Sequence, residues 1–361
     1  MIKLLFVIVL FIFLSVFANA ETKWINAKEL GISGRYNVHD GYARLTDAER
    51  EKIKESGMSD VYNLSAQGSG LHVDFLTDSE KISVRYTRVH YIMDHMAMAG
   101  SGGMDLYIKY NNKWNYAQTL RLPNQEPTYS GELFNKKGTV LSKDFVEYSI
   151  NLPLYNAVTE MEIGIDENAT IKPVLYDENN AVLVYGSSIT QGGCASRPGS
   201  SYSNILRRAI DRDVINWGFS GSGKLENTIA DIITSHECSL LIMDCVPNMT
   251  ELDLKEFEVR FRYFYANYRK AHPTTPILFI EHPVYTNFWL YNFEDKEQNF
   301  ILRDLFKEWS KTDKNIYKIK STELYGTDRE ATVDGTHATD LGFYRMSQPI
   351  IKQVKSILKI K

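Results

Sequence analysis

Cysteine is scarce in this chain of 361 residues. Only Cys194, Cys238 and Cys245 are present, too few for a disulfide scaffold, and their spacing matches no zinc-binding pattern. Stability must therefore come from a packed core. The formal net charge is only −4, and this balance gives no reason to expect binding to nucleic acid or to an anionic membrane.

Long apolar runs are lacking after the first 20 residues, so no later segment predicts a membrane-spanning helix. At the start of the chain, an apolar run over residues 4–17 leads into Ala18-Asn19-Ala20, an ending typical of signal-peptidase cleavage. We expect a signal peptide at residues 1–20, a mature chain beginning at Glu21, and a periplasmic or extracellular location without stable membrane insertion. An uncleaved anchor is the alternative, but the run is short for a membrane span.

The composition of the full chain is that of a folded protein, with 43% hydrophobic and 24% charged residues. The length predicts two domains. Residues 21–177 contain short segments of alternating polar and apolar residues separated by Gly, Asn, Asp and Ser clusters, which predicts an antiparallel, jelly-roll-like β-sandwich. One helix is expected near Thr46 to Ser56. The boundary is placed in the polar segment 177–180.

Residues 178–361 follow a different pattern, in which continuous apolar strands alternate with helical stretches. This pattern predicts a parallel sheet covered by helices on both faces. The expected strands are Ala181 to Tyr185, Val214 to Trp217, Leu240 to Met243 and Ile277 to Ile280. The expected helices span about 199–210, 222–235, 251–271, 293–312 and 339–358. Ligands of such sheets bind beyond the carboxyl ends of the strands.

The first strand end carries a candidate nucleophile. The first apolar strand runs into Gly186-Ser187-Ser188 and then toward a helix. Glycine permits a tight backbone there, and exposed amides in such a turn can donate to a developing oxyanion. Taken alone, the segment favours an ordinary polar turn over a nucleophile.

The next two strand ends supply candidate hydrogen-bond donors. Gly221 lies in a glycine-rich turn that lacks the order of a dinucleotide or phosphate-binding loop. Its amide can donate to a substrate oxygen, although a tight turn between strand and helix explains it as well. Asn248 follows the third strand. Asn248-Met249-Thr250 is also a glycosylation sequon, but its position in the fold favours a site residue.

The segment before the last expected helix carries Asp334 and His337, three residues apart on one short loop. His337 can act as general base toward a serine while Asp334 orients the imidazole. A surface turn is the alternative for this pair alone. Together, however, the strand ends supply a nucleophile, donors, a base and an orienting carboxylate, which are the parts of an acyl-transfer site.

With these residues in order, the chain resembles the SGNH, or GDSL-like, hydrolase superfamily. Gly186-Ser187-Ser188 stands where the family has Gly-Asp-Ser, with Ser187 as a departure. The resemblance implies a flavodoxin-like α/β/α domain without a metal or organic cofactor. It also implies a triad of Ser188, Asp334 and His337 and an oxyanion hole formed by Ser188, Gly221 and Asn248.

The earlier half contains Gly103-Met-Asp-Leu-Tyr107, which resembles the G-x-D-L-Y segment of β-rich domains that precede some bacterial SGNH esterases. Similar two-domain proteins include carbohydrate O-acetylesterases. The resemblance therefore implies a secreted serine esterase that removes acyl groups, O-acetyl above all, from an acylated carbohydrate. Hydrolysis of lipid or other acyl esters and non-catalytic carbohydrate binding are the alternatives.

Further candidates lie near the fourth strand and in the first half. His282 can line the pocket or serve as an alternative base, and Trp289 can stack on a sugar ring; a loop histidine and core packing explain them as well. Cys194 is interpreted as a small buried hydrophobe. His90, Asp94 and His95 lack a convincingly spaced third ligand, so no metal site is predicted.

Overall fold

The computed structural model describes residues 21–89, 91, 93–120, 126–141, 144–291 and 295–360. The expected signal peptide and His90 lie outside the described residues. In the part of the chain that is described, no helix is long and apolar enough to cross a bilayer. The described strands form three sheets, two antiparallel and one parallel.

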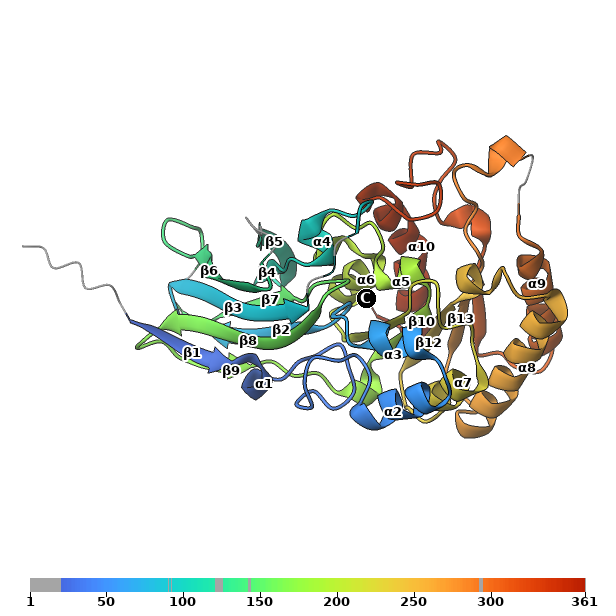
Figure 1. Ribbon diagram of the computed structural model, residues 1–361, viewed down its shortest axis with the longest axis horizontal. Coiled ribbons are helices and arrows are strands. Elements are labelled where there is room, and N and C mark those ends of the chain that lie inside the picture. Colours follow the sequence, from blue (N-terminus) through green and yellow to red (C-terminus); the bar gives the residue numbers. More distant parts are fainter. Residues whose placement is uncertain are drawn as a thin grey trace, which may run out of the picture.

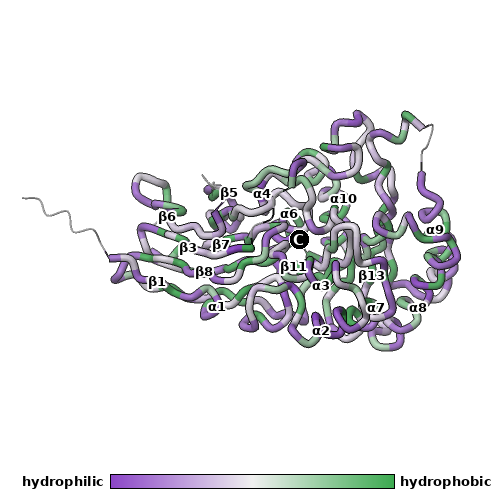
Figure 2. Tube along the Cα trace, viewed as in Figure 1, coloured by the Kyte–Doolittle hydropathy of each residue, from purple (hydrophilic) through white to green (hydrophobic). Residues whose placement is uncertain are grey.

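The two antiparallel sheets form the sandwich at the left of Figure 1. The first has the order β1 (Thr22–Asn26), β8 (Ala157–Asp166), β3 (Lys81–Val89) and β6 (Thr128–Asn135). The second has the order β5 (Lys113–Thr119), β4 (Asp105–Tyr110), β7 (Val146–Asn151), β2 (His72–Thr77) and β9 (Ile171–Pro173). Polar and apolar colours alternate along these strands in Figure 2, as expected for strands with one face in a core.

The sandwich core lies between these sheets. Phe75 of β2 and Ile163 of β8 belong to the same buried cluster and are fully shielded from solvent. Short helices border this region at α1 (Ala27–Leu30) and α4 (Met98–Ser101). The alternating pattern of residues 21–177 thus predicted the sandwich for the right reason, because alternate side chains enter the core.

Two further helices of the first half pack against the second half. They are α2 (Asp47–Glu55) and α3 (Ser59–Ser65). The predicted helix near residues 46–56 is α2; Thr46 caps it by accepting from the Glu49 amide at 3.3 Å, and the Glu49 carboxylate bonds back to the Thr46 amide at 2.8 Å. Ile53 of α2 and Val61 of α3 are buried in a cluster with strands of the parallel sheet, and Figure 1 shows α2 at the lower edge of the molecule.

The parallel sheet has the order β11 (Val214–Gly218), β10 (Val182–Gly186), β12 (Leu240–Asp244), β13 (Ile277–Ile280) and β14 (Ile316–Ile319). Numbered from β10, this is the order 2-1-3-4-5 of flavodoxin-like folds. Every residue of β10, β11 and β12 is buried, because helices cover both faces of the sheet. The predicted fold class is therefore confirmed.

Each face of the parallel sheet has its own helices. One face packs on α6 (Tyr202–Ile210) and α10 (Asp340–Leu358), and the other on α7 (Asn227–Thr234), α8 (Leu254–Ala271) and α9 (Glu297–Trp309). The remaining short elements are η1 (Glu178–Asn180), α5 (Ser188–Gln191), η2 (Pro198–Ser200), η3 (Val246–Met249), η4 (Phe288–Tyr291) and η5 (Ser321–Glu323). In a sheet of this order the switch point lies between β10 and β12, which is where ligands bind.

Candidate active site

Ser188 lies at the switch point of the parallel sheet. It is the first residue of α5, separated from the end of β10 by Ser187, and the residue is 8% exposed. Gly186 ends β10 where any side chain would collide with the hydroxyl of Thr190 and the backbone carbonyl of Asp244. The turn therefore requires glycine at this position, and it delivers Ser188 to the carboxyl edge of the sheet.

Three side chains form a relay at this edge. The Ser188 Oγ lies 2.9 Å from the His337 Nε2. The other ring nitrogen, Nδ1, lies 2.6 Å from the Asp334 Oδ2. The structure thus brings together residues that are about 150 positions apart in the chain, and both distances lie in the range of a hydrogen-bonded nucleophile, base and orienting carboxylate.

The Asp334 carboxylate is held in its charged form. Burial opposes ionisation, but hydrogen bonds from the His337 ring and from the backbone amides of His337 (2.7 Å) and Thr336 (2.9 Å) outweigh it and lower the pKa of Asp334 to about 2. At neutral pH this carboxylate is therefore an anion. An anion at Nδ1 keeps a proton on that nitrogen and leaves Nε2 free to accept the serine proton.

The predicted oxyanion donors are only partly available in this conformation. No hydrogen bond is found from the backbone amides of Ser188 and Gly221 to any described residue, so both can donate to a ligand. Asn248 lies on η3 and uses its side-chain amide differently, donating to the Phe219 carbonyl at 2.8 Å and to the Ser222 carbonyl. Asn248 thereby holds the loop that carries Gly221, which has a left-handed φ of 64°.

A buried acid supports the turn behind the nucleophile. The Asp244 carboxylate accepts from the Thr190 hydroxyl at 2.7 Å and from the Tyr202 hydroxyl at 2.8 Å, and its second oxygen has no hydrogen-bond partner among the described residues. Burial raises the pKa of Asp244 to about 7, although both hydrogen bonds act in the opposite direction. The folded protein therefore holds a proton on this group over a pH range in which the unfolded chain does not.

Replacing Asp244 with Asn is expected to remove part of the pH dependence of stability. A carboxyl group with a raised folded-state pKa loses stabilising free energy as pH rises toward that pKa, so the wild type should lose about 2–3 kcal/mol relative to Asp244→Asn between pH 5 and pH 8. Urea unfolding at both pH values measures this difference.

Asp313 provides the matched control. Burial favours its neutral form, but hydrogen bonds from the Asn315 amide and Arg269 lower the pKa of Asp313 overall. Its carboxylate stays ionised from pH 5 to pH 8, so Asp313→Asn should differ from the wild type by the same free energy at both values. Equal differences for Asp244→Asn would contradict the raised pKa of Asp244.

The sandwich half also contacts the site. The Tyr155 hydroxyl donates to the Ser188 carbonyl at 3.3 Å, and Gln191 of α5 bonds to Gln67 at 2.5 Å and accepts from the Ser69 hydroxyl at 2.6 Å. The His95 ring lies 5.6 Å from the His337 ring, centre to centre. The sequence did not predict these contacts, because a local pattern of residues does not indicate which residue more than 30 positions away will be its partner.

One set of metal-ligating side chains converges within the described part of the chain. His95, Cys194 and His337 each offer a ligand atom within 4.8 Å of the others. The donor set fits a resident metal poorly, because both nitrogens of His337 already bond to Ser188 and Asp334. Burial also raises the pKa of the Cys194 thiol to about 12, which disfavours the thiolate that a metal needs.

His282 and Trp289 lie in different environments. His282 is 1% exposed, and its Nδ1 bonds to the Pro283 carbonyl at 2.6 Å. Burial lowers the pKa of His282 to about 4, so it is a neutral structural histidine rather than a base facing a substrate. Trp289 is 56% exposed and lines a cavity next to the Asp334 loop.

Together these observations define a three-layer α/β/α protein with a Ser–His–Asp relay at its switch point. Comparisons with known proteins agree: residues 179–355 match the GDSL-like lipase/acylhydrolase family, and residues 22–171 match the N-terminal region of SGNH-hydrolase-type esterases. A solved structure from Bacteroides ovatus, assigned to the GDSL-like lipases, has 32% sequence identity and a TM-score of 0.84, over 94% of this chain and 99% of its own. The chain belongs to this GDSL-like family and is an acyl-ester hydrolase.

Two more distant structures share the fold. The salicylyl-acyltransferase of a tetracycline biosynthetic pathway has 18% identity and a TM-score of 0.74, covering 95% of this chain and 100% of its own. A family two carbohydrate esterase from Cellvibrio japonicus has 15% identity and a TM-score of 0.59, covering 94% of this chain and 98% of its own. A search among curated proteins gave no significant match.

Proposed function

We propose that this hydrolase is a serine esterase that removes O-acetyl groups from carbohydrates, with Ser188 as nucleophile. The observation that carries the proposal is the relay from the Ser188 Oγ through His337 to an ionised Asp334. His337 takes the serine proton as Oγ attacks the ester carbonyl, and Asp334 stabilises the imidazolium. The oxyanion is held by the amides of Ser188 and Gly221.

The second half of the reaction uses the same groups. The tetrahedral intermediate collapses to an acetyl-Ser188 ester, and His337 returns its proton to the departing sugar alkoxide. His337 then removes a proton from water as its oxygen attacks the acetyl carbonyl, and it gives that proton to the Ser188 Oγ as the ester bond breaks and acetate leaves. Asn248 holds the Gly221 loop before the reaction. Its amide contributes directly to the oxyanion hole if it exchanges one loop carbonyl for the substrate oxygen.

The carbohydrate substrate is supported by the arrangement of the whole chain. Two solved structures that share the fold are described as a family two carbohydrate esterase and an acetyl xylan esterase, and the sandwich half contacts the nucleophile turn through Tyr155 and Gln191. The partly exposed His95 ring of the sandwich half lies 5.6 Å from the His337 ring, so a glycan whose ester lies at Ser188 can also contact the sandwich half. We also propose export and cleavage before Glu21, which N-terminal sequencing of the secreted protein tests.

Acetate release from a panel of acetylated plant, algal and host glycans tests the proposed activity. The enzyme is expected to release acetate from at least one glycan and to prefer 4-nitrophenyl acetate to 4-nitrophenyl decanoate. A fluorophosphonate probe should label Ser188, as read by peptide mass spectrometry. A preference for the decanoate would favour a lipid hydrolase, and glycan binding without labelling or acetate release would favour a non-catalytic binding protein.

A further inference from the structure

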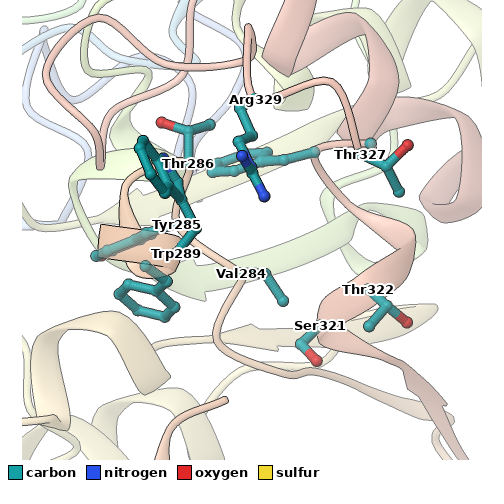
Figure 3. A pocket seen from close by; sticks show the side chains of 11 residues that line it. Val284, Tyr285, Thr286, Trp289, Ser321, Thr322, Thr327 and Arg329 are labelled. Carbon is teal, nitrogen blue, oxygen red and sulfur yellow. The ribbon is translucent and has the colours of Figure 1, made fainter. Parts of the chain in front are cut away.

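A cavity of about 490 Å³ lies beside the loop that carries Asp334 and His337. One wall is the segment that follows β13, with Thr286 and Trp289, and the other is the segment that follows β14, with Thr322, Thr327 and Arg329 (Figure 3). The volume lies in the range of small-molecule sites. Aromatic, hydroxyl and guanidinium groups thus face one space.

The cavity shares its wall with the relay. The Thr286 amide donates to the Gly335 carbonyl at 3.2 Å, and the Tyr325 hydroxyl donates to the Thr336 carbonyl at 3.2 Å. Gly335 and Thr336 are the two residues between Asp334 and His337. A ligand in this cavity therefore lies against the loop that delivers the general base.

Arg329 has an unusual backbone conformation, and its charge is not paired with a carboxylate of the described residues. Its φ is 67°, a left-handed conformation that side chains other than glycine rarely adopt and that clusters at ligand sites. The guanidinium carbon lies 4.9 Å from the centre of the Trp289 ring, and Figure 3 shows this group pointing into the cavity. No described carboxylate forms an ion pair with Arg329.

The neighbouring acid does not neutralise Arg329. Asp328 is instead bound by both terminal nitrogens of Arg345, at 2.6 and 2.7 Å, and Arg345 also donates to the Tyr325 carbonyl at 3.3 Å. Arg345 lies on α10, so this clamp ties the Arg329 segment to the rigid part of the fold. The backbone that carries Arg329 is thereby anchored, and no hydrogen bond from its guanidinium to another described residue is found.

These groups select the chemistry of the ligand. A planar guanidinium binds a carboxylate through two parallel hydrogen bonds, an indole face stacks on the apolar face of a sugar ring, and threonine hydroxyls bond to sugar hydroxyls. We propose that the cavity is a subsite for a uronic acid residue next to the acylated sugar, so that the substrate is an acylated acidic polysaccharide. The inference rests on the proposed carbohydrate esterase function.

Direct binding tests the subsite without using catalysis. Isothermal titration of the full mature chain with trigalacturonate should give saturable binding that weakens about tenfold or more in Arg329→Gln. Arg212 is a partly exposed arginine that bonds to Asn180, so Arg212→Gln is the matched control and should bind like the wild type. Equal affinity in Arg329→Gln, or equal affinity of the wild type for neutral xylotriose, would overturn the proposal.

Kinetics then connect the subsite with the reaction. On acetylated homogalacturonan, Arg329→Gln should lower kcat/KM about tenfold or more, whereas the control Arg212→Gln should keep the kcat/KM of the wild type. If a sulfated neutral oligosaccharide competes as well as trigalacturonate, the carboxylate assignment is wrong. If the wild type fails to hydrolyse 4-nitrophenyl acetate, the esterase proposal fails, and the titration still decides whether the cavity binds uronate.

Discussion

Replacing Ser188 with Ala is expected to lower kcat on 4-nitrophenyl acetate by about 10⁴-fold or more, to a residual rate supplied by the remaining groups alone. The reason is geometric: the Ser188 Oγ is the oxygen that lies 2.9 Å from the His337 Nε2, so no acyl-enzyme forms without it. Steady-state rates of purified protein measure the effect. Circular dichroism and the thermal midpoint must stay near the wild type, since only a small side chain is removed.

Ser187 provides the matched control for this substitution. Its hydroxyl accepts from the Ile189 amide at 3.2 Å and caps α5, and no contact with His337 is found among the described residues. Ser187→Ala is expected to keep kcat within about tenfold of the wild type, because losing a cap costs about 1 kcal/mol of helix stability and leaves the nucleophile in place. An inactive Ser187→Ala beside an active Ser188→Ala would reverse the assignment of the nucleophile.

Much of the fold could be predicted because the pattern of polar and apolar residues in a strand shows which of its faces are buried. The apolar run that became β10 is buried on both faces, as expected for a central parallel strand. The edge strand β14 was not predicted: it reads Ile-Tyr-Lys-Ile, and its two middle residues are only half-buried. The packing of α2 against the other half could not be predicted either, because the pattern of an amphipathic helix shows which face is buried but not which element covers that face.

Some parts of the candidate site could likewise be predicted from the sequence, and others could not. The carboxyl ends of parallel strands meet at one edge of a sheet, so Ser188, Gly221 and Asn248, which follow β10, β11 and β12, could be expected near one another. Asp334 and His337 lie on the loop before α10, and they were expected beside Ser188 because a base and an orienting carboxylate complete an acyl-transfer site. The direction of the Asn248 amide toward the Gly221 loop depends on the conformation of that loop, which the sequence does not specify. Burial of His282 likewise depends on packing around the fourth strand, and the contact of Tyr155 with the nucleophile turn depends on how the halves dock.

That docking depends on a buried charge network. His72 of β2 bonds through its two ring nitrogens to Asp74 and Asp213, each at 3.0 Å, and Asp213 directly precedes β11 of the other half. Arg207 of α6 completes the network with a 3.1 Å ion pair to Asp74 and a 2.7 Å bond to the Ser149 hydroxyl. Burial opposes ionisation of Asp74, but the charges of His72 and Arg207 keep the pKa of Asp74 well below its usual range.

Replacing Arg207 with Ala is expected to lower the free energy of unfolding by about 3–5 kcal/mol, because it removes one of the two cations that face the fully buried Asp74 carboxylate. Urea unfolding at pH 7 measures the loss. Arg262→Ala is the matched control: Arg262 pairs with Glu258 and Glu308 at the surface, where an ion pair contributes about 1 kcal/mol or less. If the two variants lose equal stability, the buried network does not hold the halves together. A large loss confined to Arg207→Ala would explain how a sandwich residue such as Tyr155 stays in place at the nucleophile turn.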